Sequence, residues 1–177
     1  MRLALPTALA AALTIGCQPA PSPTLTPEAS AVVDREVRAA AGALIQAMNG
    51  GDSASALAFF RDAPEFFYLG CTDYILGGQT FRRLVGPYYQ RTDEGRIELE
   101  VVMTQVLAPT VAVVSLRGAS RTGRALFATQ VWRREADGWQ VSAEHESWPG
   151  CAEPRDPHPF TGMPSGGGGE ADAEPGT

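Results

Sequence analysis

Hydrophobic positions recur at two spacings along the chain, and the spacing changes once. Between Val33 and Met48 they recur every three or four residues, which predicts one long amphipathic helix. From Arg96 onward they alternate with polar positions, which is the period of a strand with one buried face. Because helices precede strands, the pattern predicts an α+β domain in which helices pack on one face of a curved antiparallel sheet.

Capping residues and amphipathic segments predict three helices. Thr26 is suited to cap the first helix, and Pro27 to occupy its first position, where no backbone N–H is needed. Asp52 can cap a second, short helix that ends at Ala58. A third amphipathic segment covers 79–91, so all three helices are expected before the sheet.

Aromatic and β-branched residues mark the strands. Two short strand-like pieces flank Cys71, and glycine or proline separates the longer strands that follow. The short connections indicate that consecutive strands pair antiparallel. The long strands are expected at 96–107, 110–118, 124–134 and 139–148.

Composition allows one folded domain of ordinary size. The 177 residues are 44% hydrophobic, which is enough for a core, and the net charge is −6 at pH 7. Basic residues do not gather beyond the pairs Arg82-Arg83 and Arg133-Arg134, so nothing could neutralise a run of phosphates. We therefore expect no nucleic-acid partner.

The first residues match the layout of an export signal. Arg2 precedes an apolar stretch that ends at Ile15 and is too short to span a membrane, and Gly16 and Cys17 follow. This segment resembles a bacterial lipoprotein signal, in which cleavage before the cysteine leaves it as an acylated first residue. The resemblance implies a signal peptide at 1–16, lipidation of Cys17 and an extracytoplasmic or periplasmic protein anchored in the bacterial cell envelope. Plain secretion is the alternative.

Two flanking segments lack the apolar residues that a core requires. The proline-rich segment 17–26 is typical of an extended tether. The glycine-rich, acidic segment 156–177 is predicted to be disordered. The folded domain is therefore expected at 27–155.

The two cysteines that remain form an even pair. Disulfides persist in an oxidising compartment, so Cys71 and Cys151 are predicted to bond to each other. A metal site would need ligands at recognisable spacings, whereas the histidines are His145 and His158 and no C-x-x-C motif occurs. We expect neither a metal nor another cofactor.

The order of the predicted elements, together with three stretches of sequence, resembles the NTF2-like superfamily, and more specifically its SnoaL-like or DUF4440 branch. The stretches are NGGDSASALAFF after the first helix, the Gly77-Gly78 step into a helix that ends in tyrosines, and VWRREADGWQVSAEHES in the last hairpin. The resemblance covers about residues 28–148. It implies a cone in which the sheet curls around three helices and leaves an apolar pocket, and often a homodimer formed through the sheet. Some members are isomerases, dehydratases or cyclases and others only bind ligands, so the fold alone implies no particular activity.

The last hairpin decides which side chains face such a pocket, and two registers are open. A type I turn at 135–138 with a bulge pairs Thr129 with His145, whereas a two-residue turn moves Trp132 and Gln130 opposite the apolar face of the last strand. In both registers His145 shares that face with apolar neighbours. We expect it either to act as an acid or base in the pocket or to be a core histidine with hydrogen-bonded nitrogens.

Carboxylates are the other candidates for chemistry in the pocket. An isomerase-type site needs a carboxylate base, and Asp73, next to the short strand pieces, is the best candidate. Glu144 and Glu146 alternate with His145, so they are expected on the opposite side, facing solvent or a dimer partner.

Aromatic side chains complete the expected site. The expected catalytic candidates are Asp73 and His145, and the expected ligand-binding set is Phe60, Tyr68, Tyr74, Tyr88, Trp139 and His145. Together these features predict a secreted, lipid-anchored domain that binds a small apolar molecule. Two alternatives stay open: a non-catalytic envelope module that dimerises or binds another protein, and an isomerase- or dehydratase-type enzyme.

Overall fold

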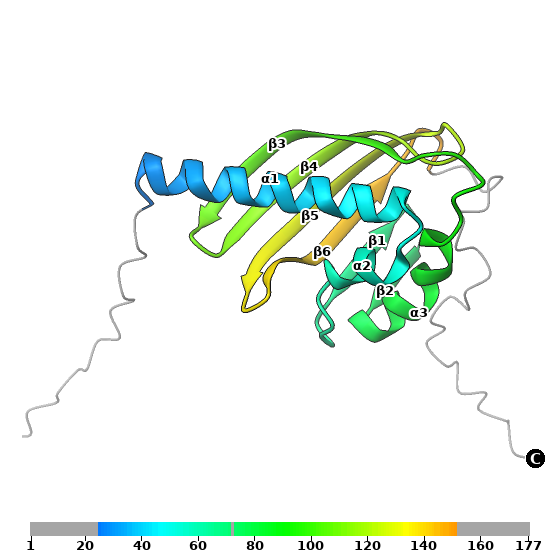
Figure 1. The fold of residues 1–177 in the computed structure, drawn as a ribbon, viewed down its shortest axis with the longest axis horizontal. Helices are drawn as coiled ribbons and strands as arrows, with labels where there is room; N and C mark the ends of the chain where they lie inside the picture. Colours follow the sequence, from blue (N-terminus) through cyan, green and yellow to red (C-terminus); the bar gives the residue numbers. More distant parts are fainter. Residues whose placement is uncertain (1–24, 72, 152–177) are drawn as a thin grey trace, which may run out of the picture.

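Three helices and six strands follow one another in the computed structural model, which describes residues 25–71 and 73–151 (Figure 1). The predicted helices and long strands are confirmed to within a residue or two at each end. The helices are α1 (Pro27–Asn49), α2 (Ser53–Ala58) and α3 (Gly78–Tyr89). The strands are β1 (Phe67–Gly70), β2 (Asp73–Leu76), β3 (Glu98–Ala108), β4 (Val111–Ala119), β5 (Ala125–Glu135) and β6 (Gly138–Ser147).

Side-chain caps begin the first two helices, as their sequences predict. The Thr26 hydroxyl accepts a hydrogen bond from the Ala29 N–H at 3.2 Å, and the Asp52 carboxylate accepts one from the Ser55 N–H at 3.0 Å. The buried stripe of α1 faces the sheet, and its members are Val33, Val37, Ala41, Leu44 and Met48.

The sheet has the strand order β2-β1-β6-β5-β4-β3. Neighbouring strands run antiparallel except β1 and β6, which are parallel, so the expected antiparallel sheet is instead mixed. The cause is the long connection through α3, which separates the β1–β2 hairpin from the other four strands. It lets β1 add beside β6, the last strand, rather than beside its neighbours in sequence.

The helices cover one face of this curved sheet. Figure 1 shows α1 running along the sheet, while α2 and α3 gather at one end with β1 and β2. The core between them is largely aromatic at that end, where the rings of Phe60, Phe66 and Phe81 lie in mutual contact with centroids 4.7 to 6.0 Å apart. The opposite face of the sheet carries no helix in the described part of the chain.

The last hairpin contains both of the registers that the sequence leaves open. Glu135 pairs with Gly138 across a two-residue turn, and Trp132 accordingly lies opposite Val141. One extra residue, Ser142, then interrupts the pairing as a β-bulge, and its hydroxyl donates to the Val131 carbonyl at 3.1 Å. Beyond the bulge the other register holds.

The bulge reverses which side chains of β6 point inward. Trp139 and Val141 are buried before it, but after the extra residue the next buried side chain is Glu144. His145 is exposed on the outer face. The expectation that His145 shares a face with Trp139 is therefore wrong, and so is the expectation that Glu144 faces solvent.

A disulfide joins Cys71, in the turn after β1, to Cys151, in the turn after β6, with Cα atoms 5.2 Å apart. Among the described residues, no helix is both long enough and apolar enough to span a membrane. The predicted signal peptide, Cys17, most of the tether and the tail 156–177 lie outside the described residues.

Candidate functional site

A cavity of about 320 Å³ opens at the end of the domain where the β4–β5 turn faces α3. Its walls come from the end of α1, from α3 and from the inner face of the sheet. Side chains from both layers line the space without filling it. The apolar part of the wall comprises Met48, Phe60, Phe81, Val85, Ile97 and Leu99.

A pair of carboxyl groups interrupts this apolar wall. Glu144 and Glu146 both line the cavity from β6, and Glu144 is only 5% exposed. The Gln130 amide donates to Glu144 at 2.8 Å, while the amide oxygen of Gln130 accepts a hydrogen bond from the Trp132 indole at 2.9 Å. Because the indole can only donate, it fixes the orientation of the amide, and the NH₂ group must point at Glu144.

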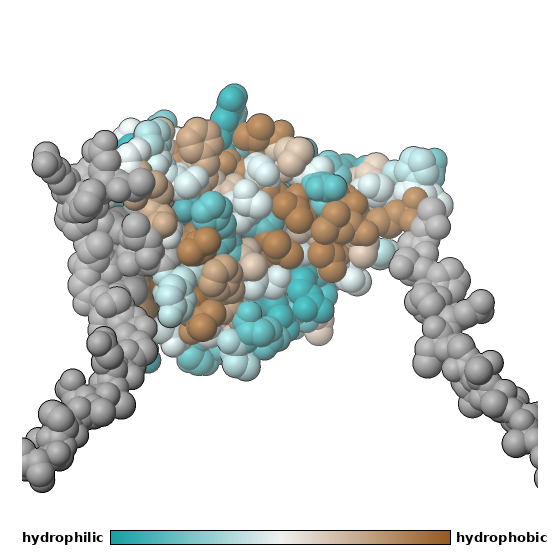
Figure 2. Space-filling model, turned by 180° about the vertical axis from the view of Figure 1, so that it is seen from behind, coloured by the Kyte–Doolittle hydropathy of each residue, from teal (hydrophilic) through white to brown (hydrophobic). Residues whose placement is uncertain are grey.

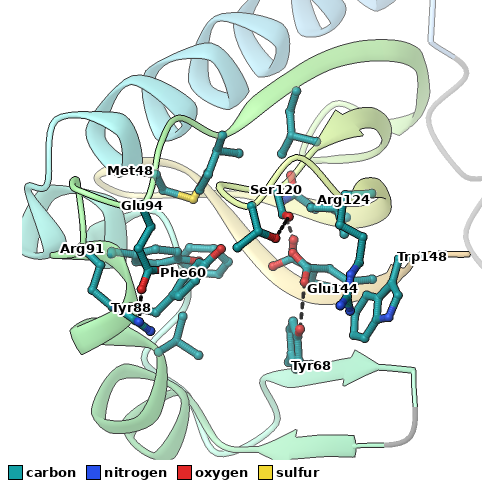
Figure 3. Close-up of a pocket in the computed structure, with 18 of the residues that line it drawn as sticks. Met48, Phe60, Tyr68, Tyr88, Arg91, Glu94, Ser120, Arg124, Glu144 and Trp148 are labelled. Atoms are coloured by element: carbon teal, nitrogen blue, oxygen red, sulfur yellow. Dashed lines mark hydrogen bonds and ion pairs between the residues drawn. The ribbon is translucent and has the colours of Figure 1, made fainter. Parts of the chain in front are cut away.

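The second carboxyl group has a different partner. The Tyr68 hydroxyl, from β1, donates to Glu146 at 2.9 Å. In Figure 3, Glu144 lies between Tyr68 and Ser120. The parallel pairing of β1 with β6 puts Tyr68 directly beside Glu144, so the unexpected strand direction contributes to the site.

Burial changes the acid strength of both carboxyl groups. It raises the pKa of Glu144 to about 8, the adjacent Glu146 carboxylate adds to the rise, and the Gln130 hydrogen bond opposes it. Burial likewise raises the pKa of Glu146, against the hydrogen bond from Tyr68. Near neutral pH the pair therefore retains a proton, and Glu144 can donate a hydrogen bond or a proton into the cavity.

The tyrosines around the pair remain protonated. Burial, with the nearby Glu146 next in importance, raises the pKa of Tyr68 and of Tyr88. For Tyr89, burial is again the main cause, followed by Glu144. All three hydroxyl groups are therefore neutral over the physiological range.

The mouth of the cavity is polar. Arg91 forms an ion pair with Glu94 there, and the Arg124 guanidinium lies 5.8 Å from the centre of the Trp148 ring. The hydroxyl groups of Ser120 and Thr122 lie 3.1 Å apart in the β4–β5 turn. In Figure 3, Arg124 and Trp148 lie on one side of the cavity, and Tyr88 and Phe60 on the other.

Of the residues predicted from sequence, Phe60, Tyr68 and Tyr88 line the cavity. Tyr74 is 55% exposed on the edge strand β2, since alternation along that short strand turns it outward. Trp139 is buried, but at the far end of the sheet, where its indole donates to Glu36 at 3.3 Å. Both were wrongly assigned to the pocket.

Of the two catalytic candidates, His145 lies outside the cavity. The bulge at Ser142 turns His145 to the outer face of the sheet, where it lies between Thr129 and Leu69. Asp73 is the first residue of β2, and its side chain lies outside the described part of the structure. No cluster of three or more histidine, cysteine or acidic residues that could hold a metal occurs within residues 25–71 and 73–151.

Sequence reasoning missed Glu144, Glu146 and Gln130, although one signal was present. Gln130 lies on the face of β5 that otherwise carries buried apolar side chains, including Leu126 and Trp132. A buried amide requires hydrogen-bonding partners, so its position pointed to a polar group on the neighbouring strand.

Comparison with known families gives one match. The model of the SnoaL-like domain matches residues 37–150, which is most of the folded part of the chain. No curated protein matches the chain.

Solved structures share the fold at low sequence identity. An NTF2-like protein of unknown function from Shewanella oneidensis is 14% identical, with a TM-score of 0.59 over 65% of this chain and 98% of that one. A protein from Streptomyces avermitilis, described as a candidate dehydratase of the NTF2-like family, is 19% identical, with a TM-score of 0.56 over 67% and 97%. An NTF2-like superfamily protein from Salmonella enterica is 16% identical, with a TM-score of 0.51 over 67% and 92%. At these identities the likeness concerns the fold alone.

Proposed function

Because the chain belongs to the SnoaL-like family of the NTF2-like superfamily, we propose that its cavity binds a small organic molecule with an apolar body. The observation that supports this is a cavity of about 320 Å³ with a mostly apolar wall and a few convergent polar groups. That combination is typical of sites for small ligands, because the wall excludes water while the polar groups orient the ligand. Membership of the DUF4440 branch stays a prediction.

Blocking the mouth tests this proposal. Thr122 is exposed at the rim of the cavity, so Thr122→Trp should close the entrance without disturbing the core. Thr110→Trp, in the turn at the opposite end of β4, is the matched control. Native mass spectrometry of the protein purified from bacterial extract should detect a small molecule in the wild type and in the control. Its equal retention in the Thr122→Trp variant would contradict binding in the cavity.

A second candidate is acid–base chemistry on such a ligand. Glu144 carries a proton near neutral pH beside a second carboxyl group, and a pair of this kind can take a proton from one carbon and return it to another atom. The similar fold of the candidate dehydratase from Streptomyces avermitilis is compatible with this chemistry. It would make the protein an isomerase- or dehydratase-type enzyme that uses Glu144 rather than His145.

Deuterium exchange tests the second candidate. A proton-transfer site should catalyse exchange of the hydrogens next to the carbonyl of benzylacetone, a simple neutral ketone, in heavy water. We expect Glu144→Gln to abolish catalysed exchange and the exposed control Glu98→Gln to retain it. Exchange at the uncatalysed rate with the wild type would count against enzymatic proton transfer.

The outer face of the sheet favours a homodimer as a further property of the protein. Exposed apolar side chains from several strands gather on this face, and Figure 2 shows hydrophobic surface across it. A second copy of the chain would cover them. The exposed apolar residues on this face include Phe67, Tyr74, Leu76, Met103 and Phe127, whose exposed fractions lie between 37% and 58%.

Substitution on that face tests dimer formation. Phe127→Glu should yield a monomer in analytical ultracentrifugation, because a charge would replace an apolar contact in the interface. Val32→Glu, on the exposed side of α1, should leave the dimer intact. A wild-type protein that is monomeric at micromolar concentration would rule this interface out.

We also propose that the protein is exported and anchored through acylated Cys17 in the bacterial cell envelope. The basis is the lipoprotein-like sequence around that residue, followed by a proline-rich segment long enough to separate the domain from a membrane. Cys17→Ser should move the protein from the detergent phase to the aqueous phase on partition. A mature protein that retains residues 1–16 would contradict the proposal.

A further inference from the structure

We propose that the occupant of the cavity is an organic cation, a primary amine on an apolar body, whose ammonium group binds between Glu144 and Glu146. This inference rests on the proposed ligand-binding function and names the class of ligand. It follows from three features of the cavity: the unfilled oxygens of the carboxyl pair, the engagement of the neighbouring arginines elsewhere, and the aromatic wall.

The carboxyl pair has acceptor capacity that the described residues do not use. One oxygen of Glu144 accepts from Gln130, and one oxygen of Glu146 accepts from Tyr68. Within residues 25–71 and 73–151, the other oxygen of each group accepts no hydrogen bond. A carboxylate can accept several hydrogen bonds, and an ammonium group has three donors to offer. Both carboxyl groups line a cavity with room for the donor.

The arginines nearest the cavity are directed at other groups. Arg121 is only 5% exposed, and its guanidinium donates to the backbone carbonyls of Gly95 and Met48. At the mouth, Arg91 pairs with Glu94, and Arg124 lies over the Trp148 ring. None of the ion pairs among the described residues includes Glu144 or Glu146. Buried Glu144 and half-buried Glu146 are costly to ionise side by side, and a bound cation would lower that cost.

The rest of the wall suits the body of such a ligand. The aromatic rings of Phe60, Tyr88 and Tyr89 line the cavity. Figure 3 shows Phe60 and Tyr88 on the side of the cavity opposite Glu144. Their faces can contact an apolar chain or ring, and they also attract a positive charge. The cavity therefore offers an anionic end and an aromatic body to one small molecule.

A neutral ketone is the competing occupant, and it requires the opposite protonation state. A ketone oxygen would accept a hydrogen bond from protonated Glu144, whereas an ammonium group requires that proton to leave. Binding of the amine should therefore release a proton and strengthen as pH rises toward the pKa of Glu144, about 8. Binding of the ketone should weaken above that pH.

The described tyrosines that face the pair should not titrate in this range. Tyr68 from β1 and Tyr88 and Tyr89 from α3 have pKa values raised by burial, so they stay neutral. The guanidinium groups of Arg121 and Arg124, from the β4–β5 turn, contact backbone carbonyls and the Trp148 ring, and Arg91 pairs with Glu94 at the mouth. A change in affinity between about pH 6 and about pH 8 would therefore report the carboxyl pair.

Calorimetry with two probes of one carbon skeleton tests the inference. The probes are benzylacetone, which is neutral, and the primary amine in which an amino group replaces its carbonyl. We expect the amine to bind at least about tenfold more tightly at neutral pH and to gain about tenfold or more between about pH 6 and about pH 8. Glu144→Gln should abolish that preference, Glu146→Gln should reduce it, and Glu98→Gln should retain it.

The other possible results of the calorimetry show which of the two proposals has failed. Equal or tighter binding of the ketone, retained in Glu144→Gln, would overturn the cationic ligand while leaving the ligand-binding function in place. If neither probe binds at millimolar concentration, both proposals fail. Circular dichroism of each variant distinguishes a lost site from a lost fold, and Glu146→Gln provides a second measurement if Glu144→Gln does not fold.

Discussion

The carboxyl group of Glu144 faces a cavity, and among the described residues it accepts one hydrogen bond, from Gln130, and forms no ion pair. Water would stabilise its ionised form, and the apolar wall does not. The same residue on the outer face of β6 would be an ordinary surface acid. The raised pKa of Glu144 is therefore caused by its surroundings in the fold and is not a property of glutamate itself.

The raised pKa of Glu144 predicts how stability depends on pH. Its pKa rises from an ordinary value of 4.5 to about 8 in the folded state, so between these values the folded protein binds more protons than the unfolded chain. The free energy of unfolding should therefore fall as pH increases through this window. The decrease should be on the order of a few kcal/mol, with Glu146 contributing in the same direction.

Urea denaturation at a series of pH values measures this dependence. Glu144→Gln keeps the shape of the side chain and removes the charge, so it should flatten the profile and stabilise the protein at the alkaline end. The exposed control Glu98→Gln should leave the profile unchanged. A wild-type profile that rises over the window would contradict the raised pKa.

At the scale of the element, β6 shows how one residue changes a whole strand. Up to Val141 the strand follows the register of a two-residue turn, and Ser142 then shifts it by one position. Because side chains alternate, that single residue exchanges the inner and outer sets for the remainder of the strand. The bulge lies between Val141, which packs in the core, and Glu144, which lines the cavity. It therefore directs the two acids of β6 into the cavity.

The start of α3 depends on a close backbone contact. A Cβ atom on Gly78 would lie 2.2 Å from the Arg61 carbonyl oxygen and 2.8 Å from the Asp62 Cα atom, both of which are backbone atoms. Gly78→Ala should therefore destabilise the protein by about 2 kcal/mol or more, because the chain between α2 and β1 must move. Thermal or urea denaturation measures the effect.

Gly42→Ala is the matched control for this change. It lies in the middle of α1 with open space around the added carbon, so the same substitution should be neutral or stabilising by up to about 1 kcal/mol. Equal effects at the two glycines would show that backbone contact at α3 is not the cause.

For the whole molecule, the disulfide closes the cavity end of the domain. The bond joins the turn after β1 to the turn after β6. Tyr68 in β1 and Trp148 just after β6 lie close to these turns in sequence, and both side chains line the cavity. The two cysteines are 80 residues apart in sequence, so the bond restricts a long loop of the unfolded chain.

Loss of this disulfide should lower the stability of the domain. The chain-entropy model predicts that Cys71→Ser with Cys151→Ser lowers the free energy of unfolding by up to about 4 kcal/mol. Denaturation of the oxidised protein and of the double variant measures the difference, and mass spectrometry verifies that the wild type is oxidised. An unchanged midpoint would mean that the packed strands alone hold this end together.

The fold was largely predictable because its signals are local. The period of three to four residues in α1, the caps at Thr26 and Asp52, and the alternation after Arg96 each depend on a few neighbouring residues. The likeness to the NTF2-like superfamily extended this local pattern to a curved sheet over helices. Three aromatic residues of the cavity were also predicted, since large side chains next to helix and strand ends gather in the core.

The tertiary structure alone decided which acids face the cavity. Alternation along β6 is a local rule, but a bulge inverts it, and the pairing between β5 and β6 determines where the bulge lies. The parallel contact of β1 with β6, which brings Tyr68 to Glu146, joins residues 78 positions apart in sequence. The sequence by itself therefore determined the elements and their order, while long-range strand pairing determined the carboxyl pair, because a side chain's direction depends on the partner its backbone meets.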